Sequence, residues 1–182
     1  MKFKKNLTYI SGLIIIEPKL FEDERGIFFE SFNQSEFNEL LGINIKFIQD
    51  NHSISKLNVL RGMHYQAKHP QGKLIRVISG EIFDVAIDMR KSSKTFSNWF
   101  GLYLSSENKK QLWIPEGFAH GFLTISENAE VIYKVTSKRY EEDERIIRWN
   151  DPKLNIDWPN KKNLIISKKD RDGQLFCEAE LN

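Results

Sequence analysis

Two histidines and one tyrosine have the chemistry and the local setting to move protons. His64 lies in the segment RGMHYQ, and His120 lies in the glycine-flanked segment GFAHG. An imidazole can accept a proton near neutral pH, and the phenol of Tyr133 is a weak acid that could donate one to a carbanion-like centre. Each residue also has a structural interpretation, as a hydrogen-bonded core histidine or a packed strand tyrosine. A base and an acid together would suit removal and return of a carbon-bound proton.

The segment around His120 contains Pro-x-Gly-x-x-His, which resembles one half of the two-part signature of cupin β-barrels. The metal-binding half of that signature needs His-x-His followed closely by a carboxylate. Here the next histidine after His64 is His69, and no Asp or Glu occurs before Glu81. The pattern therefore predicts a barrel that keeps its pocket without a metal, and acid–base chemistry carried by side chains alone. His69 and His52 are interpreted as structural.

Four charged residues could assist such chemistry. Arg25, in a charged run that also holds Glu30, could hold a phosphate with its planar guanidinium group. Lys73 begins an apolar segment and could stabilise a developing oxyanion. Asp170 could orient a histidine, as carboxylates do in catalytic triads. For each of them a solvated surface position is the competing interpretation.

Alternating patterns predict the strands that would position these groups. Residues 83–89 are apolar at odd positions and include Asp84 and Asp88 at even ones, which indicates a half-buried strand. The turn residues 79–81 precede it, so residues 73–78 are its expected partner strand.

The same period of two places Tyr133 and Lys134 on opposite faces of a strand around residues 131–135. It also places Arg61 and His64 on opposite faces of their strand, so spacing alone does not bring those two together. Many short strands of this kind favour a sandwich or barrel.

One helix interrupts the strands. Asn33 is a candidate N-cap with Glu36 three positions later, Phe37 and Leu40 give an apolar stripe, and Gly42 is a natural stop. A second short helix is expected near the C-terminus. The predicted fold class is all-β, a cupin-type β-sandwich or jelly-roll barrel with a few short helices.

Composition limits the classes of function. The chain has 182 residues, taken as one domain, and 27 Lys and Arg against 25 Asp and Glu, a net charge of +2 that argues against nucleic-acid binding. Cys177 is the only cysteine, which fits a reducing compartment. The interrupted stretch before Pro18 is read as a buried strand and not as a signal peptide, and no apolar run is long enough to span a membrane. A cytoplasmic location is expected.

Walker A, Gly-x-Gly-x-x-Gly and Gly-x-Ser-x-Gly motifs are absent, which argues against NTPases, dinucleotide-dependent enzymes and serine hydrolases.

Taken together, the segments resemble the dTDP-4-dehydrorhamnose 3,5-epimerase family. Nine segments match in the same order over nearly the whole chain, and Met63 is a conservative departure from the leucine that is usual there. The segments are FEDERGIFFESF (21–32), QDNHS (49–53), VLRGMHYQ (59–66), QGKLIRV (71–77), FDVAIDMR (83–90), QLWIPEGFAHGF (111–122), YK (133–134), NDP (150–152) and SKKD (167–170).

The resemblance implies a metal-free and cofactor-free cupin homodimer that acts on a thymidine-diphosphate 4-keto-6-deoxy hexose. It implies that His64 is the general base, Tyr133 the general acid, Asp170 the partner of His64, and Lys73 the cation beside the 4-keto oxygen. It further implies that N-terminal strands are exchanged between subunits, so that Arg25 and Glu30 could serve the neighbouring site. The implied substrate contacts are Arg25, Glu30, Gln49, Asn51, Arg61, His120, Glu144 and Lys169.

Two alternatives remain open at this point. The chain could invert one carbon only, or act on another nucleotide 4-keto sugar such as a GDP-linked keto-heptose. It could also be a carbohydrate-binding cupin without activity, although a binder has no need of a base and an acid. A ketoisomerase of the same barrel class fits the residue set less well.

Overall fold

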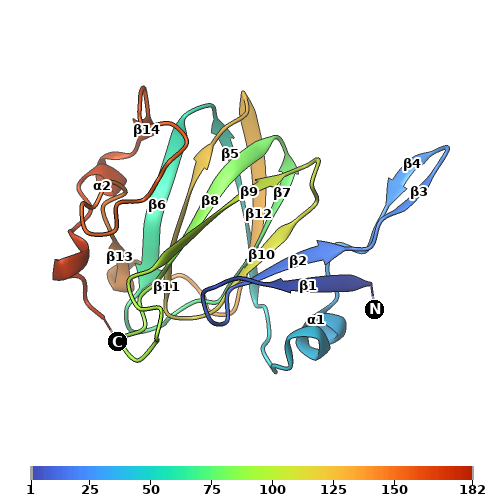
Figure 1. Ribbon diagram of the computed structural model, residues 1–182, viewed down its shortest axis with the longest axis horizontal. Helices are drawn as coiled ribbons and strands as arrows, with labels where there is room; N and C mark the ends of the chain where they lie inside the picture. Colours follow the sequence, from blue (N-terminus) through green and yellow to red (C-terminus); the bar gives the residue numbers. More distant parts are fainter. Residues whose placement is uncertain (1, 182) are drawn as a thin grey trace.

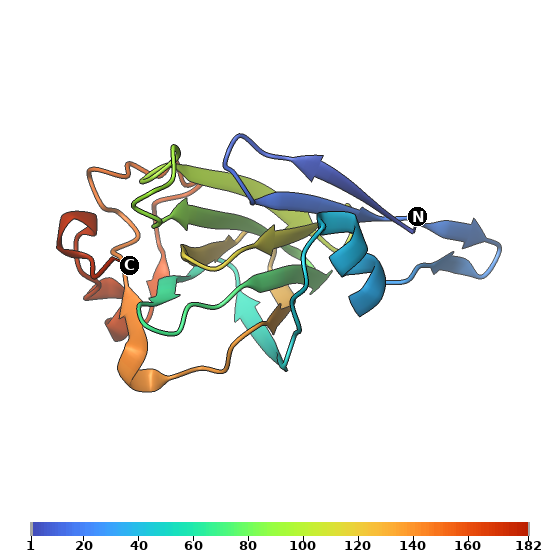
Figure 2. The ribbon, with the colours of Figure 1, turned by 90° about the horizontal axis from the view of Figure 1, so that it is seen from below.

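Two mainly antiparallel sheets face each other in the computed structural model, which describes residues 2–181 (Figures 1 and 2). The first sheet contains, in spatial order, β1 (Phe3–Leu7), β2 (Ile14–Pro18), β10 (Gln111–Ile114), β7 (Lys73–Ser79), β12 (Asn128–Val135) and β5 (Gln49–Lys56). The second contains β13 (Glu144–Ile146), β6 (Val59–Gln66), β11 (Phe118–Thr124), β8 (Glu81–Asp88) and β9 (Trp99–Ser105), and β14 (Ile165–Ile166) pairs with β6 in parallel. The predicted all-β sandwich is confirmed.

Apolar side chains fill the space between the sheets and also cover the outer face of the second one. Ile75 and Val77 of β7 meet Ile82 and Ala86 of β8 in the interior. On the outer face of the second sheet, the C-terminal segment packs Trp158 and its neighbours against β8. Both faces of β8 are therefore buried.

This double burial corrects the interpretation of residues 83–89 as a half-buried strand. Asp84 and Asp88 have no exposed surface. They are tolerated because each has polar partners: Asp84 binds His120, and Asp88 binds Arg90, with side-chain atoms 2.8 Å apart in each case.

The expected hairpin of residues 73–78 with residues 83–89 is also wrong. β7 and β8 lie in different sheets, and Gly80 makes the crossing between them. Gly80 has a φ of +76°, and a Cβ atom there would lie 2.0 Å from the Asn128 carbonyl oxygen. The two strands bury their apolar faces against each other across the sandwich, and not side by side.

The predicted helix is confirmed as α1 (Gln34–Leu41). The Asn33 side chain accepts hydrogen bonds from the backbone N–H groups of Ser35 and Glu36, and Gly42 ends the helix with a left-handed conformation. α1 packs Phe37 and Leu40 against the outer face of the first sheet. The C-terminal region contains α2 (Lys168–Arg171), with 3₁₀ turns at Glu141–Asp143 (η1) and Phe176–Glu178 (η2).

The N-terminal stretch forms β1 and β2, as expected for a strand ending at Pro18. It is followed by a hairpin of β3 (Phe21–Asp23) and β4 (Gly26–Phe28), which projects away from both sheets (Figures 1 and 2). Every residue of β3 and β4 is exposed, including the apolar Phe21 and Phe28. Among residues 2–181, no helix is long and apolar enough to cross a membrane.

Candidate active site

A cleft of about 660 Å³, called the main cleft below, opens between the two sheets and is bordered by α2, β13 and β14. Strands of both sheets contribute side chains to it. The main cleft brings together nine of the twelve residues singled out from the sequence: Asn51, Arg61, His64, Lys73, His120, Tyr133, Glu144, Lys169 and Asp170.

A bulge in β6 decides which of its side chains enter the main cleft. His120 of β11 pairs with His64, but Phe122 pairs with Arg61, so β6 has one residue more than β11 in this stretch. The extra residue returns Arg61 to the face of His64, and both line the main cleft. The expectation that these two side chains point to opposite faces is therefore wrong.

Two facing glycines allow this bulge. Gly62 has a φ of +111°, and a Cβ atom there would lie 2.6 Å from the His120 carbonyl oxygen. At Gly121, on the partner strand, a Cβ atom would lie 2.5 Å from the Arg61 carbonyl oxygen. The backbones approach too closely for any side chain at either position.

The side chain of His64 is held by a carboxylate that lies 106 residues further along the chain. Its Nε2 atom lies 2.7 Å from Oδ1 of Asp170, whose Oδ2 accepts the backbone N–H of Gly62 at 3.3 Å. Burial acts to raise the pKa of Asp170, but the hydrogen bonds from His64 and Gly62 outweigh it and hold that pKa below its usual range. An ionised carboxylate only accepts hydrogen bonds, so Nε2 carries the hydrogen and Nδ1 of the neutral imidazole keeps the free lone pair.

The short helix α2 fixes the position of Asp170. The Ser167 side chain caps α2 and accepts the backbone N–H of Asp170 at 3.1 Å. Asp170 was predicted to orient a histidine, and the structure places it in hydrogen-bond contact with His64.

His120 lies beside His64 but is bound to a different carboxylate. Its Nε2 atom lies 2.8 Å from Oδ2 of Asp84, and both side chains are buried. Burial lowers the pKa of His120, although Asp84 opposes this shift. The sequence interpretation missed Asp84 as a partner. An acidic residue inside an otherwise apolar strand was the available signal, because a buried carboxylate requires a partner.

Lys73 lies at the base of the main cleft, on β7. Its ammonium group is buried, and its Nζ atom lies 3.4 Å from the His64 carbonyl oxygen. Burial lowers the pKa of Lys73 to about 8, against the opposing effect of the Glu144 and Asp84 carboxylates.

Tyr133 enters the main cleft from β12, in the sheet opposite His64. Burial raises the pKa of its phenol, with the nearby Arg61 acting in the other direction, so the group stays protonated at neutral pH. As predicted, the next residue points the other way, and Lys134 pairs with Asp50 at 3.0 Å.

The rim of the main cleft carries a charge cluster built around Glu144. Arg139 donates to its carboxylate at 3.1 Å, and Lys169 also donates to it. Burial acts to raise the pKa of Glu144, but these two cations lower it to about 2. Arg139 was not identified from the sequence, where it is one member of a long charged run without periodicity.

Three of the predicted residues do not line the main cleft. Gln49 is adjacent and donates to the Asn51 side chain at 2.8 Å. Arg25 lies in the projecting hairpin and pairs with Asp23 at 2.5 Å, and Glu30 pairs with Lys2 at 2.5 Å. Within one chain the hairpin does not reach the main cleft.

Among residues 2–181, no group of three or more His, Cys, Asp or Glu side chains is placed to hold a metal ion.

Comparisons with known proteins agree on one family. The family model described as dTDP-4-dehydrorhamnose 3,5-epimerase matches residues 7–178. The enzyme of that name from Pseudomonas aeruginosa is 53% identical over 171 residues, covering 94% of each chain, and that of Salmonella typhimurium is 54% identical over 175 residues, covering 96% of each. The crystal structure of dTDP-6-deoxy-D-glucose-3,5-epimerase from Legionella pneumophila, in complex with dTDP-4-keto-L-rhamnose, is similar with a TM-score of 0.94 and 49% identity, covering 97% of this chain and 94% of that one.

Proposed function

Because the chain belongs to the dTDP-4-dehydrorhamnose 3,5-epimerase family, a family of isomerases, we propose that it inverts C-3 and C-5 of a dTDP-4-keto-6-deoxy hexose by proton transfer. The observation that carries the mechanism is one cleft in which the His64–Asp170 pair faces Tyr133 across the two sheets. A carbon centre is inverted when its proton leaves on one face and another arrives on the opposite face.

The proton is removed by Nδ1 of His64. Carbons C-3 and C-5 both flank the C-4 ketone, so loss of either proton gives an enolate. Asp170 keeps the ring in the tautomer with a free Nδ1 lone pair and stabilises the imidazolium that forms. Tyr133 then donates its phenolic proton from the other side, and water resets both groups.

The negative oxygen of the enolate lies beside Lys73. An ammonium group in a buried site stabilises such an oxyanion far more than it would in water. Arg61 and Lys169 are two cations of the same cleft that can bind the diphosphate. His120, Asn51 and Glu144 complete the contacts to the substrate.

A homodimer with exchanged hairpins would supply what the single chain lacks. β3 and β4 expose Phe21, Ile27 and Phe28 with exposed fractions of 47%, 49% and 74%. A hairpin that exposes three large apolar side chains is stabilised when they pack on a second copy. That packing would carry Arg25 and Glu30 into the neighbouring site. A cytoplasmic location stays a prediction, supported by the exposed, unpaired Cys177.

Solvent exchange tests the proposed reaction. The protein is incubated with dTDP-4-keto-6-deoxy-D-glucose in deuterated water, and the sugar is followed by NMR. We expect deuterium at C-3 and C-5 together with formation of the inverted product. Label at one carbon would indicate a single-carbon epimerase, and tight binding without label would refute the enzyme assignment. The His64→Ala variant should lose exchange at both carbons, whereas His52→Ala, at an exposed histidine outside the main cleft, should keep it.

Subunit complementation tests the exchanged hairpin. His64→Ala and Arg25→Ala homodimers should both be inactive or nearly so. When the two variants are coexpressed, one site of each mixed dimer has both residues intact, so activity should return. Complementation that fails although mixed dimers are isolated would show that Arg25 does not serve the neighbouring site.

A further inference from the structure

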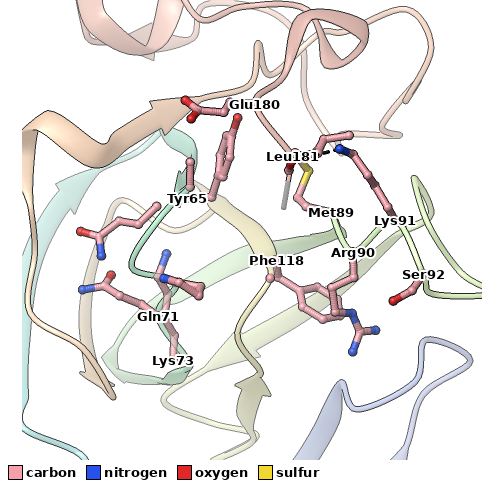
Figure 3. Close-up of a pocket in the computed structure, with 14 residues that line it drawn as sticks. Tyr65, Gln71, Lys73, Met89, Arg90, Lys91, Ser92, Phe118, Glu180 and Leu181 are labelled. Atoms are coloured by element: carbon pink, nitrogen blue, oxygen red, sulfur yellow. Dashed lines mark hydrogen bonds between the residues drawn. The ribbon is translucent and has the colours of Figure 1, made fainter.

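A second, smaller cavity lies behind the main cleft. It has a volume of about 230 Å³ and is called the side chamber (Figure 3). In Figure 3, Gln71 and Lys73 lie on one side of it and Phe118 and Met89 on the other, and Leu181 of the C-terminal tail lies near Met89 and Lys91. The dashed line marks the hydrogen bond that holds Leu181 at the border of the chamber, from Lys91 Nζ to the Leu181 carbonyl oxygen at 3.1 Å.

Lys73 lies between the two spaces. It lines both the side chamber and the main cleft, together with Tyr65, Gln66 and Gln71. Its ammonium group can therefore be approached from the substrate side and from behind. A substrate in the main cleft would block only the first of these routes.

The polar side chains that surround Lys73 in the side chamber are bound to protein atoms. The amide of Gln66 donates to the Lys138 carbonyl oxygen at 3.2 Å, and that of Gln71 donates to the Ser137 carbonyl oxygen at 2.5 Å. Among the described residues, the three N–H donors of Lys73 make one hydrogen bond, to the His64 carbonyl oxygen at 3.4 Å. A buried ammonium group with one long hydrogen bond requires further partners.

We propose that the side chamber is a binding site for water molecules that hydrate the Lys73 ammonium group while substrate occupies the main cleft. The chamber is large enough for several water molecules, and the Ser92 hydroxyl and the side-chain oxygen of Gln71 are lining groups that can hydrogen-bond to them. Its contribution to the reaction rests on the oxyanion-stabilising role proposed for Lys73.

The charged neighbours of Lys73 do not replace this hydration. Asp84 on β8 is bound to His120 through Oδ2, and its buried Oδ1 makes no hydrogen bond to Lys73 or to any other described residue. Glu144 on β13 is bound to two cations. His64 on β6 and Tyr133 on β12 face the substrate space. Loss of chamber water would thus favour the neutral amine, which cannot stabilise an enolate oxygen.

The test is a direct measurement of Lys73 ionisation in variants that fill or open the side chamber. Ala67 lines the chamber, so Ala67→Met should fill it with an apolar side chain, and Ala67→Ser is the matched control that stays small and polar. Leu181→Ser should replace part of the apolar lining with a small polar side chain and open the chamber further to solvent. Protein labelled with ¹³C at lysine Cε is titrated by NMR, with the Lys73 signal assigned through Lys73→Arg.

We expect the Lys73 pKa to fall in Ala67→Met, to stay unchanged in Ala67→Ser and to rise in Leu181→Ser. If the pKa of Lys73 falls by about one unit, the fraction of Lys73 that is charged at pH 8 falls from about one half to about one tenth. Turnover of Ala67→Met should then be about fivefold lower at pH 8 and recover toward pH 6.

The proposal is overturned if the pKa of Lys73 is the same in folded Ala67→Met and Ala67→Ser. If Ala67→Met does not fold, an unchanged pKa in Leu181→Ser overturns it instead. The titration uses the protein without substrate, so it is independent of the proposed reaction. Absent epimerisation with an intact pKa response would refute the proposed reaction and leave the hydration of Lys73 standing.

Discussion

The hydrogen bond from His64 to Asp170 gives the sharpest prediction about activity. Asp170→Asn keeps the size of the side chain and removes its charge. A hydrogen bond to a charged group contributes about 1.5–3 kcal/mol. At about 1.4 kcal/mol for each factor of ten in rate, its loss alone lowers turnover by roughly tenfold to 150-fold.

A second effect of Asp170→Asn acts on the tautomer of His64. The amide can donate a hydrogen to Nε2, which moves the imidazole proton to Nδ1 and removes the free lone pair. In a serine-protease triad the corresponding change costs about 10⁴-fold. We therefore expect turnover of Asp170→Asn to fall between about 10²-fold and 10⁴-fold.

The assay for Asp170→Asn is product formation and deuterium exchange at saturating substrate, with thermal unfolding as the check on folding. Asp172→Asn, two residues along the chain, is the control because it makes the same charge change on an exposed side chain at the end of α2. That control should keep full turnover. A folded Asp170→Asn protein that retains more than half of the normal turnover would refute the assignment of Nδ1 as the base.

Three further predictions concern the acid, the rim and the bulge. Tyr133→Phe should lower the rate of inversion by about 10²-fold or more, because the proton donor is lost. Deuterium exchange catalysed by His64 should persist. Loss of both inversion and exchange in a folded protein would contradict the assignment of His64 as base and Tyr133 as acid. The pKa of Glu144 is lowered on folding from its ordinary 4.5 to about 2, so its contribution to stability is present above pH 4.5 and is lost between pH 4.5 and 2. The full pKa shift corresponds to about 3 kcal/mol, but Arg139 and Lys169 are half exposed, and screening by solvent reduces the contribution to about 1 kcal/mol. In urea unfolding, the stability of Glu144→Gln should therefore fall less between pH 4.5 and 2 than that of the native protein. The same pH profile in both proteins would disprove this contribution. Gly121→Ala should lower the free energy of unfolding by about 2–4 kcal/mol. A variant as stable as the native protein would refute the close approach of the two backbones at the bulge.

Part of the fold was readable because local rules agree with the tertiary structure. Asn33 and Gly42 delimit α1 through capping chemistry that needs only neighbouring residues. Tyr133 and Lys134 point to opposite faces because their strand has no bulge at that point. Asp170 and His64 are 106 residues apart, and their pairing came from resemblance to a family and not from any pattern within the chain.

The predictions that failed depended on contacts between distant segments. Periodicity could not show that both faces of β8 are covered. The C-terminal segment packs on the face of Phe83 and Val85, and the other face, which holds Asp84 and Asp88, is buried as well. Nor could the turn at Gly80 show whether the chain returns beside β7 or crosses to the other sheet. Both outcomes are decided by what packs on a face, and that information lies far away in the sequence.

The bulge in β6 shows how one local irregularity assembles the candidate site. In a regular strand, His64 and Arg61 would point to opposite faces, because side chains alternate with a period of two. A cleft with His64 would then lack Arg61, one of the cations proposed to bind the diphosphate, and a cleft with Arg61 would lack the proposed base. Gly62 and Gly121 remove this conflict by letting two backbones approach where no Cβ atom fits. The glycines next to the two histidines therefore contribute to the proposed chemistry through geometry, although neither has a side chain that could take part in it.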